Sequence, residues 1–115
     1  MSVQPFSQIQ NQPSKPRVVL SSIEQVSNLL RAKPELLNIP AFSGLRPLIE
    51  YLKNNGKGCG CTIKELYARY LPNFSAAINS LKSSDIEIMK NVLNASQICY
   101  YTRSKVNGAL ERICL

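Results

Sequence analysis

A loop of glycine and cysteine at residues 56–61 constrains the fold of this chain more than any other stretch, because it separates two regions with helical patterns. The loop reads Gly-Lys-Gly-Cys-Gly-Cys. Glycine adopts backbone conformations that other residues avoid, so a run of this kind ends one helix before the next begins. We expect a tight passage between two helices, formed by the structural loop residues Gly56, Gly58, Cys59, Gly60 and Cys61.

Two helices are predicted before the loop. Ser21 and Glu24 have the spacing of a capping box, so the first helix begins there and ends near Lys33. Ser43 is expected to cap the second helix. Four apolar residues at helical spacing predict the buried face of this second helix: Leu45, Leu48, Ile49 and Leu52.

Further helices are predicted after the loop. Thr62 and Glu65 repeat the capping-box spacing and open a helix with a wide apolar stripe. Pro72 is expected to break this helix, because proline lacks the N–H that a helix interior needs. A short helix then precedes another that opens at Ser84 and Glu87.

The last residues, 98–115, change character. Ile98 to Thr102 is a run of strand-forming residues, and Asn107-Gly108 is a strong hairpin signal. We therefore predict a C-terminal β-hairpin at residues 98–115. The alternative is a single helix that continues through Gly108.

A two-residue turn at this position fixes a register for the hairpin. It pairs Tyr101 with Cys114 and places Cys99 diagonally across from Cys114. The same register sets Arg103 opposite Arg112, and like charges in that arrangement are destabilising. A bulge or a longer loop that shifts the register is the alternative.

The predicted fold class is mainly α: a small helical domain of short helices at residues 21–115, with an extended N-terminal arm at residues 1–20. The arm is rich in glutamine, proline and serine, so it cannot bury enough apolar surface to offset its ordering entropy. We expect it to bind a partner or to fold back on its own domain. The residues predicted to contact partners are Phe6, Ile9, Pro13, Arg17, Tyr100 and Tyr101.

The chain is basic and carries few charges for its size. Its net charge is +7, yet charged residues make up only 18% of the sequence, against roughly 25% in soluble domains. The low share of charge indicates surface that a partner covers. The basic residues are dispersed, so they serve either solubility or binding of nucleic acid, with Tyr100 and Tyr101 available for stacking on bases. Both interpretations stay open.

Four cysteines permit three interpretations. Cys59, Cys61, Cys99 and Cys114 could supply four thiolates to zinc, although one intervening residue is short for a zinc pair. Cys59 and Cys61 could form a redox pair, which usually has two intervening residues. We favour the third interpretation, incidental free thiols in a reducing compartment with no cofactor bound.

Catalytic residues are scarce in this sequence. It contains no histidine and seven carboxylates, and three of these, Glu24, Glu65 and Glu87, are assigned to helix caps. No acid–base pair or activated nucleophile follows, so we expect neither an enzyme nor a small-molecule substrate. No apolar run approaches the ~20 residues that span a bilayer, so we expect no membrane partner.

The order of these elements from Leu45 to Leu115 resembles small uncharacterised proteins of tailed bacteriophages that carry a Gly-Cys-Gly-Cys loop. The segments that carry the resemblance are Leu45–Leu52, Gly58–Cys61, Ser84–Leu93 and Val106–Leu110. The resemblance implies a role in a virion or its assembly and supplies no catalytic residues.

These observations favour a non-enzymatic structural or assembly component of a large complex, most simply a bacteriophage virion assembled in the host cytoplasm. Its expected partners are protein subunits of the capsid, neck or tail, with nucleic acid possible. The alternatives are a basic nucleic-acid-binding or ribonucleoprotein subunit and a small zinc or thiol protein that uses Cys59 and Cys61.

Overall fold

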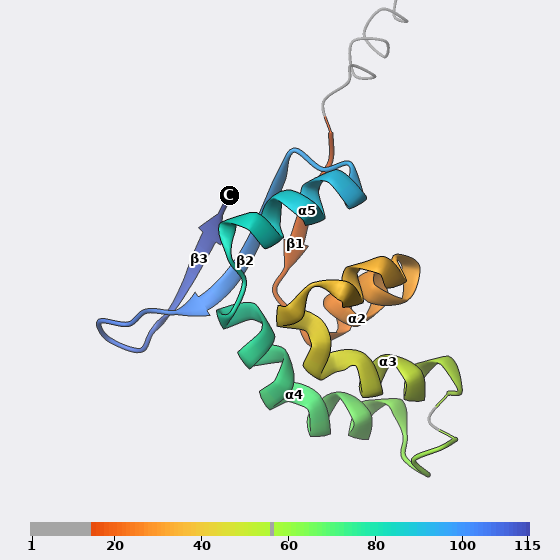
Figure 1. The fold of residues 1–115 in the computed structure, drawn as a ribbon. Helices are drawn as coiled ribbons and strands as arrows, with labels where there is room; N and C mark the ends of the chain where they lie inside the picture. The colour runs from red at the N-terminus through yellow and green to blue at the C-terminus, as the bar shows by residue number, and fades with distance from the viewer. Residues whose placement is uncertain (1–14, 56) are drawn as a thin grey trace, which may run out of the picture.

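The computed structural model describes residues 15–55 and 57–115 (Figure 1). Its fold is mainly α, as the sequence predicts, with a small sheet formed by segments from both ends of the described chain. In chain order the elements are β1 (Arg17–Leu20), α2 (Ile23–Ala32), the 3-10 helices η1 (Pro34–Asn38) and η2 (Pro40–Leu45), α3 (Arg46–Lys53), α4 (Ile63–Asn79), α5 (Ser83–Leu93), β2 (Gln97–Arg103) and β3 (Leu110–Cys114).

The sheet has the strand order β1-β2-β3. Strands β2 and β3 are antiparallel and form the predicted hairpin, so the alternative of a continuous helix is excluded. Strand β1 runs parallel to β2, with Arg17 beside Gln97 and Leu20 beside Tyr100. The predicted start of the body at residue 21 is therefore wrong, because residues 17–20 belong to the sheet and the Leu20 side chain is buried.

The register of the hairpin differs from the prediction by two residues. Cys114 lies directly opposite Cys99 instead of Tyr101, and a loop of six residues joins the strands. Side chains stabilise this longer loop: Ser104 Oγ accepts from the Val106 N–H at 3.1 Å, and Asn107 Oδ1 accepts from the Ala109 N–H at 3.0 Å. The shift also separates the two arginines that a tight turn would have placed face to face.

The core lies between the helices and one face of the sheet. All four residues of the predicted stripe before the glycine loop, Leu45, Leu48, Ile49 and Leu52, are buried, which confirms the helical spacing. Burial of each such side chain stabilises the fold by about 1.5–3 kcal/mol. The remaining large, fully buried side chains are Leu20, Leu30, Leu36, Phe42, Leu66, Ile86, Met89 and Ile98.

The capping box at the start of α4 is confirmed in both directions. The Glu65 N–H donates to Thr62 Oγ1 at 3.1 Å, and the Thr62 N–H donates to Glu65 Oε1 at 2.8 Å. Two of the orphan N–H groups of this helix end are thereby satisfied. The Cys-Gly-Cys segment therefore leads directly into a fixed helix N-terminus.

The other predicted caps are wrong by one residue or more. Ser22, not Ser21, caps α2 by accepting from the Gln25 N–H at 3.1 Å. Ser43 lies within η2, so α3 begins at Arg46 without a side-chain cap. At α5 the cap is a carboxylate, because Asp85 accepts from the Lys82 N–H at 3.1 Å and leaves Ser84 without that role.

The predicted break at Pro72 is also wrong, because α4 continues through it to Asn79. A proline inside a helix loses one backbone hydrogen bond and costs about 3 kcal/mol. Ala77 and Ile78, in the last turns of the same helix, are buried in the core. Leu66, before the proline, is buried as well, so packing on both sides of Pro72 holds the helix together.

Candidate functional site

The outer face of the sheet gathers basic and aromatic side chains that are distant in the sequence. Side chains alternate between the two faces of a strand, so the pairing register decides which residues share a face. The inner-face residues Leu20, Ile98 and Tyr100 are buried in the core. The outer-face positions are Arg17, Val19, Gln97, Cys99, Tyr101, Arg103, Leu110, Arg112 and Cys114. Three of these nine are arginines and none is Asp or Glu.

Much of this outer face is open to solvent. The Tyr101 side chain is 42% exposed, Val19 is 38% exposed and Leu110 is 63% exposed. Arg17, Arg103 and Arg112 are exposed as well. A large aromatic ring and several guanidinium groups therefore occupy one accessible surface, which we call the Arg–Tyr face.

Single contacts orient the three guanidinium groups. Arg17 Nε donates to Gln97 Oε1 at 3.0 Å, and Arg103 Nη1 donates to the Gly108 carbonyl at 2.8 Å. Arg112 Nη2 lies 3.9 Å from Cys99 Sγ. A guanidinium has five N–H donors, so each keeps donors for an anionic ligand.

Tyr101 lies beside two of these arginines, Arg103 and Arg112. It pairs directly with Arg112 across the strands and is two residues from Arg103 on the same strand. Directly opposed residues have Cβ atoms about 5 Å apart, so the phenol ring has a cation on two sides. This combination suits a flat anionic ligand, because the ring offers a stacking surface and the guanidinium groups bind oxyanions.

The structure places the adjacent residues Tyr100 and Tyr101 on opposite faces of β2. Tyr100 is 7% exposed and faces the core, where burial raises the pKa of its phenol. Tyr100 is therefore not available for a surface contact, contrary to the prediction, whereas Tyr101 is exposed. Of the predicted arm contacts, Arg17 belongs to the Arg–Tyr face, and Phe6, Ile9 and Pro13 lie outside the described residues.

All four cysteines are paired, which corrects the expectation of incidental free thiols. Cys59 pairs with Cys61, and Cys99 pairs with Cys114, with Cα–Cα distances of 5.2 Å and 4.0 Å. The structure does not bring the four cysteines together, and the described residues contain no group of three or more Cys, His, Asp or Glu that could hold a metal ion.

The loop between α3 and α4 brings the first cysteine pair beside a cation. Arg69 Nη1, from the second turn of α4, lies 3.2 Å from Cys59 Sγ. Gly60 has φ +73°, a left-handed conformation that glycine adopts without strain. A Cβ on Gly58 would contact the Tyr51 ring at 3.4 Å, so the loop passes close to α3. Gly56, the first of the predicted loop residues, lies outside the described residues.

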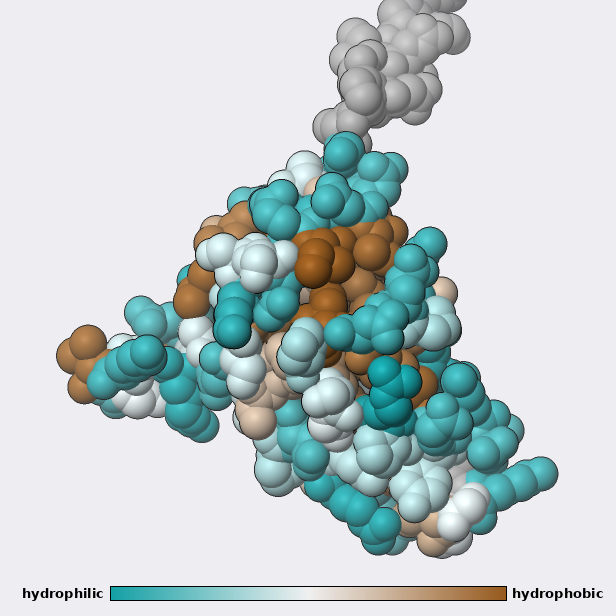
Figure 2. Space-filling model, in the orientation of Figure 1, coloured by the Kyte–Doolittle hydropathy of each residue, from teal (hydrophilic) through white to brown (hydrophobic). Residues whose placement is uncertain are grey.

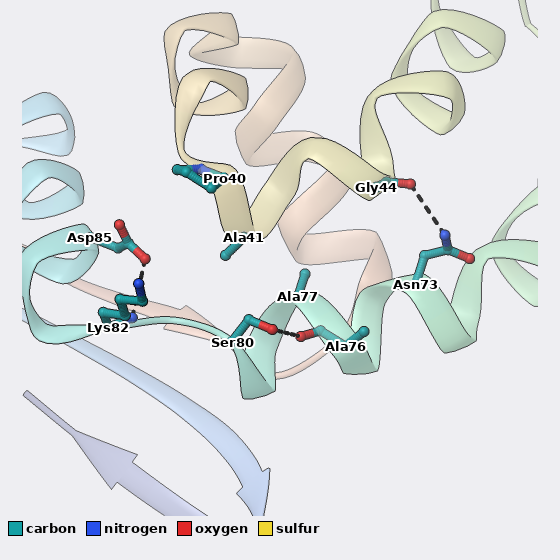
Figure 3. Close-up of a pocket in the computed structure, with 9 residues that line it drawn as sticks. All are labelled: Pro40, Ala41, Gly44, Asn73, Ala76, Ala77, Ser80, Lys82 and Asp85. Carbon is teal, nitrogen blue, oxygen red and sulfur yellow. Dashed lines mark hydrogen bonds between the residues drawn. The ribbon is translucent and has the colours of Figure 1, made fainter.

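A cavity of about 330 Å³ lies between η2 and the C-terminal half of α4 (Figure 3). Its polar side chains bind neighbouring backbone groups: Asn73 Nδ2 donates to the Gly44 carbonyl at 3.3 Å, and Ser80 Oγ donates to the Ala76 carbonyl at 2.7 Å. Asp85 accepts the capping bond from Lys82. These groups are already engaged, so the cavity indicates no particular ligand.

Within the described part of the chain, no helix is both long and apolar enough to cross a membrane. The chain matches no protein-family model, no curated protein and no solved structure.

The alternation of side chains along strand β2 is the sequence signal that could predict part of the Arg–Tyr face. Cys99, Tyr101 and Arg103 are spaced by two in a predicted strand, so they share a face in any register. Arg112 and Leu110 could be added only with the correct register, and the sequence gives no sign that Arg17 belongs beside them.

Proposed function

We propose that this protein is a non-enzymatic subunit of a large nucleoprotein assembly and that its Arg–Tyr face binds single-stranded nucleic acid. The observation that carries the proposal is the gathering of three arginines and Tyr101 on an accessible sheet face without a carboxylate. Proteins that bind single strands combine a positive surface with aromatic rings on which bases stack.

The residues of the Arg–Tyr face can bind different parts of a nucleic acid. Arg103 and Arg112 flank Tyr101, so phosphates on either side of a stacked base meet a guanidinium group. Their contacts to Gly108 and Cys99 limit side-chain motion before a ligand arrives, which lowers the entropy lost on binding. Leu110, opposite Arg103, adds an exposed apolar contact on the same face.

Fluorescence anisotropy with labelled 15-nucleotide DNA and RNA tests the proposal, with duplex DNA of the same length as a comparison. We expect single strands to bind more tightly than the duplex. Three neutralised phosphates give a slope of log K against log salt of about −2, at roughly −0.7 per phosphate. The DNA and RNA arms identify which nucleic acid is preferred.

Matched variants separate the face from the overall charge. Arg112→Gln and Arg31→Gln remove one positive charge each. Arg112 belongs to the Arg–Tyr face, whereas Arg31 lies in α2, near Tyr67 of α4. We expect weaker binding and a smaller salt slope only for Arg112→Gln. Tyr101→Ala should weaken binding by about 1–3 kcal/mol, and Tyr101→Phe should not. Equal losses for the two arginine variants would show that binding is non-specific and would refute the proposal.

A second candidate function is a structural component of a virion that contacts protein subunits. Its support is the hairpin loop, which projects from the body and carries a hydrophobic group at its tip (Figure 2). Val106 in this loop is 93% exposed, and exposed apolar groups of this kind suit insertion into a partner. The resemblance to bacteriophage proteins points in the same direction.

Particles purified from the cells that make this protein test the second candidate. We expect the chain to co-purify with particles through a density gradient and Val106→Asp to be lost from them, while Lys105→Gln in the same loop remains. If the unmodified chain separates from the particles, the virion role is wrong, whatever the result for nucleic acid.

A further inference from the structure

We propose that Cys59 and Cys61 form a redox-active pair that exchanges electrons with external disulfides and dithiols. This activity goes beyond nucleic-acid binding and involves the opposite end of the molecule (Figure 1). The two residues are separated only by Gly60, and Thr62, the next residue, is the N-cap of α4. Helix N-termini carry a partial positive charge that favours a thiolate.

Arg69 supplies a full charge to the same place. Its guanidinium lies 3.2 Å from Cys59 Sγ and contacts that sulfur from the side of the helix. The carboxylate of Glu65, in the first turn, is bound to the Thr62 N–H at 2.8 Å. This carboxylate offsets part of the charge of the helix N-terminus and also lies near Arg69. The guanidinium contact is therefore what favours the thiolate of Cys59, which is the nucleophile in exchange reactions.

The pair is also accessible to a partner. Both cysteines are half-buried at the edge of the core, whereas Cys99 is 0% exposed. A Cβ built on Gly60 meets no atom within 4 Å, so the loop is open on that side. An approaching disulfide therefore meets no side chain at Gly60, between the two cysteines.

The exchange balances without another co-reactant. The Cys59 thiolate attacks a disulfide R–S–S–R, forming a mixed disulfide and releasing one RS⁻. Cys61 then loses its proton to solvent, attacks Cys59 Sγ and releases the second RS⁻. The Cys59–Cys61 bond forms, the substrate disulfide breaks, and two electrons pass to the substrate; the reverse sequence oxidises a dithiol substrate.

Single variants of the full-length chain test the assigned roles, with glutathione disulfide as the probe and intact mass as the readout. Cys61→Ser leaves Cys59 to form a glutathione adduct that cannot be resolved. Cys59→Ser leaves only the Cys61 sulfur of this pair, and the Arg69 contact is to Cys59. We expect the adduct to form about tenfold faster in Cys61→Ser than in Cys59→Ser. Equal rates in two folded variants would overturn the proposal.

The unmodified chain provides the second test and needs no substitution. Over a series of glutathione redox buffers, we expect the Cys59–Cys61 bond to open and close reversibly while Cys99–Cys114 stays closed. Arg69→Met should shift the equilibrium toward the disulfide by about threefold or more, because it destabilises the thiolate, and Arg69→Lys should restore most of the effect. A Cys59–Cys61 pair that never interconverts in any buffer refutes the activity.

Discussion

The two cysteine pairs of this protein are chemically identical, yet they occupy opposite kinds of environment. Cys99 and Cys114 join two strands at positions 15 residues apart, and Cys99 is fully buried. Cys59 and Cys61 are two residues apart in a partly exposed loop. A cross-link restricts the unfolded chain more when it closes a longer loop. The first pair therefore stabilises the fold, and the second is free to serve chemistry.

The sheet geometry supports the structural role of the hairpin pair. Ile98 and Leu115 exchange both backbone hydrogen bonds, at 3.0 Å and 2.9 Å. The adjacent pair, Cys99 and Cys114, is therefore a non-hydrogen-bonded pair, in which opposed side chains approach most closely. Backbone pairing thus brings these two sulfurs together, and the cross-link reinforces a register that the strands already favour.

The largest expected effect comes from removing each pair in turn. The double variant Cys99→Ala/Cys114→Ala should lose about 3 kcal/mol of unfolding free energy, as expected for a closed loop of this length. The double variant Cys59→Ala/Cys61→Ala should lose only about 1.5 kcal/mol, because the loop it opens is so short. Urea denaturation at neutral pH measures both. Similar losses would contradict the division between a structural and an exchangeable pair.

A smaller effect is expected from the helix cap behind the exchangeable pair. Thr62→Ala removes the Oγ1 acceptor of the Glu65 N–H and should lower the unfolding free energy by about 1 kcal/mol. Thr62→Ser keeps an acceptor and serves as the control. Thermal denaturation measures the change. If the unfolding free energy of Thr62→Ala is unchanged, the packing of α4 rather than its cap orders the loop that carries Cys59 and Cys61.

A gain in stability is expected within the helical part. Ser27 Oγ in α2 is buried, and it has no hydrogen-bond partner among the described residues. Ser27→Ala removes an unsatisfied hydroxyl, so it should raise the unfolding free energy by up to about 1 kcal/mol. Ser80→Ala is the matched control, because Ser80 Oγ donates to the Ala76 carbonyl and its loss should bring no gain. A loss of stability in Ser27→Ala would indicate an unrecognised partner for this hydroxyl.

Local and long-range features of this fold differ in how far the sequence predicts them. Some local signals predict local structure correctly: the Thr62 cap, the buried stripe at residues 45–52 and the presence of the hairpin. The other three caps and the turn of the hairpin are predicted wrongly, because several nearby residues can satisfy the same pattern. The glycine loop was correctly placed between two helices. Its cysteine pairing was missed, because the spacing of cysteines does not state which sulfurs meet.

Long-range features could not be read in this way. Strand β1 exists only because β2 lies beside it, and the contact between Arg17 and Gln97 spans 80 residues. The continuation of α4 through Pro72 depends on burial of residues beyond the proline. The Arg–Tyr face needs both the parallel strand and the shifted register, so the sequence identified Arg17 and Tyr101 without indicating that they share a surface.

The smallest expected effect is a change in how stability depends on acidic pH. It tests whether the Thr62–Glu65 cap of α4, next to the exchangeable pair, acts electrostatically as well as sterically. The hydrogen bonds from Thr62 hold the pKa of Glu65 below its ordinary value of 4.5. A carboxyl whose pKa is lowered by folding stabilises the folded state above its unfolded pKa, and this contribution is lost as the pH falls through the lower, folded pKa. Stability should therefore decline a little more steeply below pH 4.5 in the unmodified chain than in Thr62→Ala.

Glu65 is exposed, so we expect a small difference in stability. An NMR titration of the Glu65 side chain, together with urea denaturation at several pH values, measures it best. Thr62→Ala keeps the backbone N–H that is the largest cause of the lowered pKa and removes only the side-chain contribution. An unchanged Glu65 titration in Thr62→Ala would therefore show that the side chain of Thr62 has no electrostatic part in this cap.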